Sequence, residues 1–169
     1  MTDMFRLDGK TALVTGAGTG LGQHFAQVLA HAGARVVIAA RRSEKLAKTE
    51  SLITAAGGEV FAVALDVRSA SNISAAFDAA ESQFGPVDVL VNNAGVTSTS
   101  QILDLTPDEW DEVMKVNIKG AFFLSQALYA RMKVRKKGRI INIGSISGER
   151  GAKYAGAHYS ISKAAVIMM

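Results

Sequence analysis

The stretch that decides the fold is Thr15-Gly16-Ala17-Gly18-Thr19-Gly20-Leu21-Gly22. The apolar run Thr11–Val14 precedes it, and a helical pattern from His24 to Ala30 follows it. A strand, a glycine turn and a helix in this order place unpaired helix N–H groups where an anionic phosphate can sit. Glycine allows the tight turn, the close approach of the backbone to a pyrophosphate, and the close packing of helix on strand.

The spacing of these glycines differs from the common dinucleotide fingerprint. The pattern G-x-G-x-x-G, counted from Gly16, needs a glycine at position 21, which is Leu21. The sequence has T-G-x-x-x-G-x-G instead. Because ordinary loops also contain glycines, this motif alone leaves a plain turn open as an alternative.

The composition bounds the class of protein. Apolar residues make up 49% of the 169 residues, charged residues 20%, and cysteine is absent. These values predict one globular domain over residues 1–169. No apolar run is long enough to span a bilayer, and the N-terminus lacks the layout of a secretory signal. We therefore expect a cytoplasmic protein with no membrane partner and no disulfide framework.

Histidines and cations suggest neither a metal site nor a nucleic-acid interface. His24, His31 and His158 have no carboxylate or cysteine cluster around them, so no metal ligation is expected. The formal charge is +4, and six cations crowd the segment from Arg131 to Arg139. Cations at the end of a helix interact favourably with its dipole, and no aromatic residue interleaves within this cluster. We therefore expect no nucleic-acid partner.

Strands and helices alternate along the chain. The expected strands are Thr11–Val14, Arg35–Ala40, Val60–Leu65, Val87–Val91 and Arg139–Ile143. The expected helices follow the glycine turn, then span Ser43–Ala56, Ser69–Phe84 and Thr106–Lys133, with a last one from Gly156. Strands that are apolar throughout predict an α/β fold with a parallel sheet covered by helices on both faces. The leading topology is a doubly wound, Rossmann-like sheet with strand order 3-2-1-4-5.

In that order, the chain connections diverge between the first and fourth strands. Ligands bind outside the carboxyl ends of the strands at such a point. Two segments meet there, Gly16–Gly22 and Asn92–Gly95, which favours the phosphate-binding interpretation over a plain turn.

The chain resembles the short-chain dehydrogenase/reductase family over essentially its whole length. The resemblance rests on six motifs in the family's order: Thr15-Gly16-x-x-x-Gly20-x-Gly22, Asp66, Asn92-Asn93-Ala94-Gly95, Asn117, Ser145 and Tyr159-x-x-x-Lys163. It implies hydride transfer between a nicotinamide cofactor and an alcohol or ketone substrate. We expect Thr15 and the motif glycines to hold the cofactor. Asp66 and Val67 should line the adenine pocket, and Asn93 and Gly95 should border the cofactor.

The pair Tyr159 and Lys163 suits the acid–base chemistry of an alcohol. Removing hydride from an alcohol also requires a base that takes the hydroxyl proton. A phenol is a poor base at neutral pH because its ordinary pKa is about 10. Two residues four apart share one face of a helix, and an ammonium beside a phenol favours the phenolate. In the family the lysine also holds the nicotinamide ribose. The alternative is a packed tyrosine beside a solvated lysine.

Ser145 and Asn117 complete the expected catalytic set. Ser145 ends the fifth strand, so its hydroxyl is placed to donate a hydrogen bond to the substrate oxygen. Asn117 is a poor helix former inside a long helical pattern, which suggests a role beyond packing. In the family it holds a water that links the lysine to a proton relay. Ser145 and Tyr159 are fourteen residues apart, one more than in many family members, and the loop from Glu149 can absorb the difference.

The region after the second strand favours NADP(H). NAD-preferring folds place a carboxylate there to bind the adenosine ribose, but this chain has Ala40, Arg41 and Arg42. A guanidinium suits a 2′-phosphate by charge and by bidentate geometry. We expect Arg41 to be the main determinant and Arg42 a secondary one. The alternative is that both arginines are surface charge and that the cofactor is NAD.

Three further expectations concern the whole protein. The last helical pattern ends at Met169 without a capping glycine, and the fifth strand would be a bare apolar sheet edge. Since family members are longer, we expect a C-terminally incomplete chain without the later strands and the substrate loop. The resemblance implies a homodimer or homotetramer for the parent protein. A catalytically silent nucleotide-binding or regulatory protein on the same fold is the competing function.

Overall fold

The computed structural model describes residues 3–150 and 155–169. Its centre is one parallel sheet with the order β3-β2-β1-β4-β5. The strands are β1 (Thr11–Thr15), β2 (Arg35–Ala40), β3 (Val60–Ala64), β4 (Val89–Asn92) and β5 (Arg139–Asn142). The predicted strand order is therefore confirmed, and β5 lies at the edge of the sheet with Ile141 exposed.

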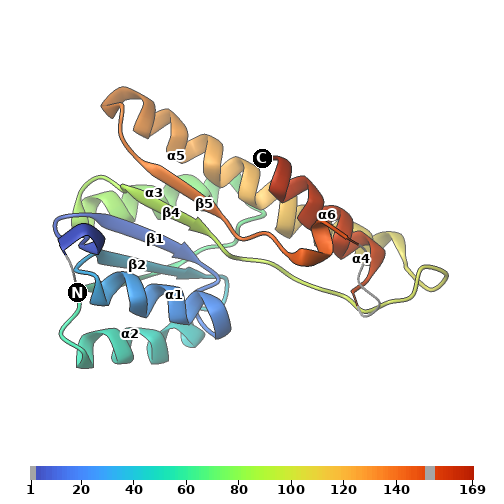
Figure 1. The fold of residues 1–169 in the computed structure, drawn as a ribbon, viewed down its shortest axis with the longest axis horizontal. Coiled ribbons are helices and arrows are strands. Elements are labelled where there is room, and N and C mark those ends of the chain that lie inside the picture. Colours follow the sequence, from blue (N-terminus) through green and yellow to red (C-terminus); the bar gives the residue numbers. More distant parts are fainter. Residues whose placement is uncertain (1–2, 151–154) are drawn as a thin grey trace.

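Helices cover both faces of the sheet (Figure 1). On one face lie α1 (Gly20–His31) and α2 (Leu46–Ala55), and on the other lie α3 (Ala70–Phe84) and α5 (Ala121–Arg135). The short helix α4 (Pro107–Met114) and the last helix α6 (Ala157–Met168) lie together beyond the carboxyl ends of the strands. Residues 3–150 and 155–169 also contain three 3₁₀ turns, which are η1 (Asp3–Phe5), η2 (Ser43–Lys45) and η4 (Ile146–Gly148).

Alternating residues of each central strand enter two separate cores. Leu13 packs with the buried faces of α3 and α5, where Phe77 and Leu128 are fully buried. Its neighbours Ala12 and Val14 pack on the other face with α1 and α2. Successive side chains of a strand point to opposite faces, so a strand covered on both sides needs apolar residues at every position. This explains the uninterrupted apolar runs in the sequence.

The prediction of a single α-helix from Thr106 to Lys133 is wrong for the residues in the middle of that segment. Its start is confirmed, since Thr106 and Glu109 form a capping box at the N-terminus of α4. Between α4 and α5, however, residues Lys115–Gly120 form a π-helical turn, labelled η3. Such turns are rare and often mark functional sites. Gly120 lets this turn approach the segment after β3 closely, because a Cβ there would lie 2.7 Å from Cγ2 of Val67.

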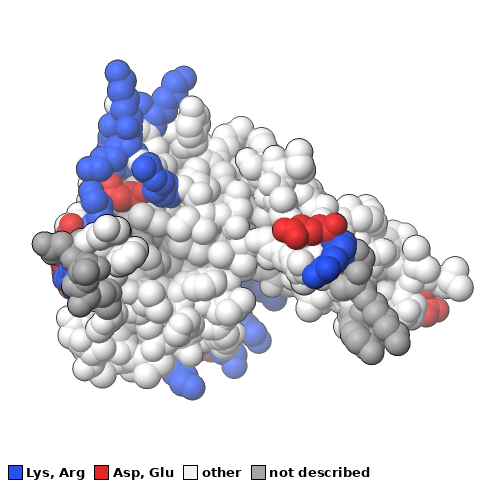
Figure 2. Space-filling model, viewed as in Figure 1, with Lys and Arg blue, Asp and Glu red and all other residues white. Residues whose placement is uncertain are grey.

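Part of the basic cluster at the end of α5 is paired within the chain. Arg131 contacts Asp78 and Glu81 of α3 at 2.6 Å each, and Arg135 lies 3.6 Å from Asp88. The other cations of the cluster lie at the end of α5 and in the turn that leads to β5. Figure 2 shows Lys and Arg side chains gathered at its upper left, where α5 ends in Figure 1. In the described part of the chain, no helix is long and apolar enough to cross a membrane, and no three potential ligand side chains group around a metal position.

Candidate active site

The predicted glycine turn forms a cradle between β1 and α1. Gly16 and Gly20 have φ angles of +66° and +57°, a region that favours glycine. A Cβ on Gly22 would lie 2.3 Å from the carbonyl oxygen of Gly16, so only glycine fits there. The Thr19 side chain does not cap α1, which leaves the first N–H groups of that helix available to an anion.

Thr15 and Asn93 fasten the cradle to the end of β4. The Thr15 hydroxyl donates to the Val91 carbonyl at 3.2 Å and accepts from the N–H groups of Asn93 and Ala94 at 3.0 Å each. The Asn93 side chain donates to the Thr15 carbonyl at 2.9 Å. Both side chains therefore hold the two strand ends together.

A cleft of about 260 Å³ opens at this point. It runs from the glycine cradle past the end of β2 to the segment after β3, and it ends at Gly95, Val96 and Val116. Of the residues predicted from the sequence to hold the cofactor, Thr15, Gly16, Arg41, Arg42, Asp66, Val67 and Gly95 line it. The sheet's topology thus brings together segments from four loops, as the switch-point argument predicts.

Replacing Gly22 by Ala should distort this cradle. The new methyl group would overlap the Gly16 carbonyl and the Asn93 amide nitrogen, which lies 2.5 Å from the Cβ position. Overpacking of this kind costs about 1–3 kcal/mol. We expect a lower melting temperature and binding of the expected nicotinamide cofactor weakened about tenfold or more, measured by thermal unfolding and fluorescence titration. Gly57→Ala is the control for binding, because Gly57 follows α2 with open space around its Cβ position; its positive φ makes the change cost stability, but no residue of the cradle is touched. Wild-type binding by the Gly22 variant would contradict the role of the cradle.

Asp66 lies at the wall of the cleft where β3 ends. The Arg68 guanidinium donates to both of its carboxylate oxygens, at 2.9 Å and 2.6 Å. These hydrogen bonds lower the pKa of Asp66, so the carboxylate is an anionic acceptor. Val67 is buried beside it and packs against Gly120.

Tyr159 and Lys163 occupy one side of α6. The Lys163 ammonium donates to the Ile143 carbonyl at 2.6 Å and lies 5.9 Å from the centre of the Tyr159 ring. Lys163 is buried, and this burial lowers the pKa of its ammonium. The carbonyl that it binds follows β5 directly, two residues before Ser145, whose hydroxyl accepts from the N–H of Ser147 at 3.2 Å. In the loop between Ser145 and Tyr159, residues 151–154 lie outside the described part of the chain.

Asn117 links the cleft to α6. From the π-helical turn, its amide oxygen accepts from the Val96 N–H at 2.8 Å, and its amide nitrogen donates to the Val96 carbonyl at 3.0 Å. The same nitrogen donates to the Ser162 hydroxyl at 2.9 Å, and that hydroxyl donates to the Tyr159 carbonyl at 2.7 Å. The buried Asn117 side chain therefore fixes the end of the cleft against the helix that bears Tyr159 and Lys163.

Sequence reasoning missed two cations at the cleft. Lys45 lies in η2 and packs its Cβ against Gly18, and Arg68 follows Val67; both line the cleft. A sequence signal existed for each, since Lys45 extends the run of cations after β2 and Arg68 follows the expected adenine-pocket residues.

Comparison with known proteins identifies the family. A profile of the family described as short chain dehydrogenase matches residues 10–169. The chain therefore belongs to the short chain dehydrogenase family, which confirms the resemblance. It is 39% identical over 165 residues to a ketoacyl reductase, HetN, of a Nostoc species, covering 98% of this chain and 57% of that protein. It is 40% identical over 161 residues to the 3-oxoacyl-acyl-carrier-protein reductase FabG of Vibrio cholerae, covering 95% and 64%.

Solved structures show the same fold. A short-chain type dehydrogenase/reductase from Mycobacterium marinum superposes with a TM-score of 0.95 at 34% identity, over 99% of this chain and 70% of that one. A gluconate 5-dehydrogenase from Burkholderia cenocepacia, solved with NADP and tartrate, gives a TM-score of 0.91 at 39% identity, over 98% and 65%. The chain thus spans less than two thirds of the length of the two curated relatives above.

Proposed function

We propose that the protein is an NADP(H)-dependent oxidoreductase that transfers a hydride between the cofactor and an alcohol or ketone. The observation that carries this proposal is the link through Asn117 between a glycine-cradled, cation-lined cleft and the helix with Tyr159 and Lys163. Membership of a family whose relatives are named reductases and dehydrogenases supports it.

The residues of the cleft fit a phosphorylated dinucleotide. The glycines let β1, its turn and the N-terminus of α1 pack closely, and the uncapped N–H groups of that helix suit a pyrophosphate. The Asp66 carboxylate is a suitable acceptor for the adenine amino group, and Val67 gives that pocket an apolar wall. Arg41 and Arg42 lie at the end of β2, where the adenosine ribose of a dinucleotide is bound in this type of fold. Their charge favours NADP over NAD.

The side chains around α6 have distinct roles in the proposed reaction. The nicotinamide supplies or accepts the hydride when it is bound. Tyr159 exchanges the proton with the substrate oxygen, and Ser145 donates a hydrogen bond to the same oxygen. Lys163 would stabilise the negative charge of the tyrosine oxygen and hold the nicotinamide ribose when the cofactor is bound, while Asn117 is a positioning residue. A panel of ketones and 3-oxoacyl thioesters with NADPH would test the substrate class, which the names of the two ketoacyl reductases suggest.

Replacing Arg41 by Ala should weaken NADPH binding about tenfold and leave NADH binding within about twofold. The reason is that a hydrogen-bonded charge contributes about 1.5–3 kcal/mol, and only NADPH has the 2′-phosphate. Parallel calorimetric titrations of both cofactors give the two dissociation constants. Arg139→Ala is the control, since Arg139 is exposed at the opposite end of the strands. If the wild-type protein binds NADH as tightly as NADPH or more tightly, the assignment of NADP(H) as the preferred cofactor is wrong.

Three expectations about the whole protein stay predictions: a homo-oligomer, a cytoplasmic location, and the absence of a nucleic-acid partner. The outer surface of the helix region from α4 to α5 supports the first. There, Phe122 and Phe123 are exposed beside Met114 and Ile118 in an apolar hollow. Large exposed apolar patches of this kind are typical of protein interfaces.

A further inference from the structure

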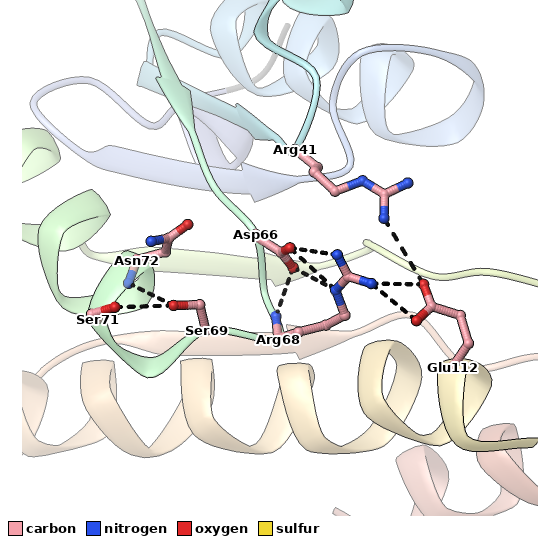
Figure 3. A network of polar contacts seen from close by, with 7 residues as sticks. All are labelled: Arg41, Asp66, Arg68, Ser69, Ser71, Asn72 and Glu112. Atoms are coloured by element: carbon pink, nitrogen blue, oxygen red, sulfur yellow. Dashed lines mark hydrogen bonds and ion pairs between the residues drawn. The ribbon is translucent and has the colours of Figure 1, made fainter. Parts of the chain in front are cut away.

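Four charged side chains from three segments form one network at the part of the cleft that Arg41, Asp66 and Arg68 line (Figure 3). Arg68 donates to Asp66 on one side and to both carboxylate oxygens of Glu112, at 3.1 Å and 3.0 Å, on the other. Arg41 reaches the same Glu112 carboxylate at 3.9 Å. Glu112 comes from α4, far in sequence from the segments after β2 and β3. Two cations and two anions make the network neutral as a whole.

The two arginines are held very differently. Arg68 makes five side-chain hydrogen-bond contacts to two carboxylates, which fix its guanidinium. Arg41 makes one long ion pair, and its side chain is 56% exposed. An exposed ion pair of this length is weak, so Arg41 is free to turn toward a ligand in the cleft. Glu112 keeps its place when Arg41 leaves, because Arg68 still binds it.

We propose that Glu112 is a specificity-determining residue that sets how strongly the cleft prefers a nucleotide with a 2′-phosphate. Its carboxylate competes with the phosphate for Arg41, and it repels the phosphate at short range. A nucleotide without the phosphate neither needs Arg41 nor meets this repulsion. The inference rests on the proposed function, in which Arg41 binds the 2′-phosphate of NADP(H).

Glu112→Gln tests this inference because it removes the charge and keeps the shape of the side chain. We expect NADPH and adenosine 2′,5′-bisphosphate to bind about threefold tighter at low ionic strength, with NADH and AMP unchanged. The measurement is calorimetric titration of the full chain, with the melting temperature as a check on folding. Asp111→Asn is the matched control, since it removes the same charge from the neighbouring position of α4, where Asp111 pairs with Lys115.

A double variant, Arg41→Ala with Glu112→Gln, shows whether Glu112 acts through Arg41. Most of the gain in NADPH affinity should disappear in the Arg41→Ala background. An unchanged NADPH-to-NADH affinity ratio in Glu112→Gln, or the same change in Asp111→Asn, would overturn the inference. If the wild-type protein does not prefer NADPH, or Arg41→Ala does not reduce that preference, the proposed function fails and this inference with it. If the wild-type protein prefers NADPH and Arg41→Ala reduces that preference, but Glu112→Gln leaves the affinity ratio unchanged, the inference about Glu112 fails and the proposed function stands.

Discussion

A Tyr159→Phe variant is expected to reduce ketones with NADPH at least about a hundredfold more slowly than the wild-type protein, with NADPH affinity within about twofold. The expected loss is that of a positioned acid–base group, which contributes about 10²-fold to 10⁴-fold. Phenylalanine keeps the ring that lies 5.9 Å from the Lys163 ammonium and removes only the hydroxyl. The half-buried position on α6 tolerates this change, because α6 is held to its neighbours by other side chains: Ser162 accepts from Asn117, and Lys163 donates to the Ile143 carbonyl.

Steady-state NADPH oxidation and fluorescence titration separate the two effects. Tyr129→Phe is the matched control, because Tyr129 is exposed on α5 and does not line the cleft. Its rate should equal that of the wild-type protein. Turnover by Tyr159→Phe at the wild-type rate would remove Tyr159 from the mechanism, whereas a lost rate together with lost binding would indicate a structural role.

A Lys163→Met variant should lose at least about a hundredfold in rate without losing stability at neutral pH. Methionine removes the cation that contacts both the Tyr159 ring and the carbonyl just after β5. Two effects on stability oppose each other. The variant no longer buries a charge, which favours its folded state, but the Ile143 carbonyl loses its donor, which costs about 1 kcal/mol. We therefore expect the free energy of unfolding to stay within about 1 kcal/mol of the wild-type value.

The pH dependence of this stability difference has a definite sign. Burial lowers the pKa of Lys163 from its ordinary value of 10.5, so the folded protein binds fewer protons at this site than the unfolded chain does. The wild-type protein should therefore gain stability relative to Lys163→Met as the pH rises through the interval below 10.5. Urea unfolding of both proteins from neutral pH up to mildly alkaline pH measures this, with Lys48→Met as an exposed control. A constant difference would show that Lys163 titrates normally.

The sheet and the cradle follow from local patterns that are visible in the sequence. The middle of β1 is apolar at every position because Ala12, Leu13 and Val14 enter two different cores, whereas a strand with one face in water would alternate apolar and polar residues. The positive φ angles of Gly16 and Gly20 are likewise local, and the Gly16 carbonyl that excludes a Cβ at Gly22 lies six residues away, although Asn93 of a distant segment crowds the same position. Short-range rules suffice for features of this kind.

Other features depend on contacts between distant segments, which no local pattern encodes. The π-helical turn follows from the fit of Asn117 against Val96 and of Gly120 against Val67, so the same residues alone suggest an ordinary helix. The pairing of Arg68 with Glu112 joins residues 44 positions apart. The family motif predicts that Thr15 holds the cofactor, but its hydroxyl is bound to three groups of β4 and the segment after it, which only the strand register brings within reach.

The hydrogen bonds of Thr15 and Asn93 have a consequence for mutational surveys. Because these side chains join the ends of β1 and β4, a substitution at either position would displace the loop that lines the cleft. We therefore expect such a substitution to weaken nucleotide binding through the position of the loop. A mutational screen that measures only nucleotide affinity would identify Thr15 and Asn93 as residues that contact the nucleotide directly. Amide hydrogen exchange in the nucleotide-free protein would distinguish a lost contact from a displaced loop, since a displaced loop would exchange faster even without nucleotide.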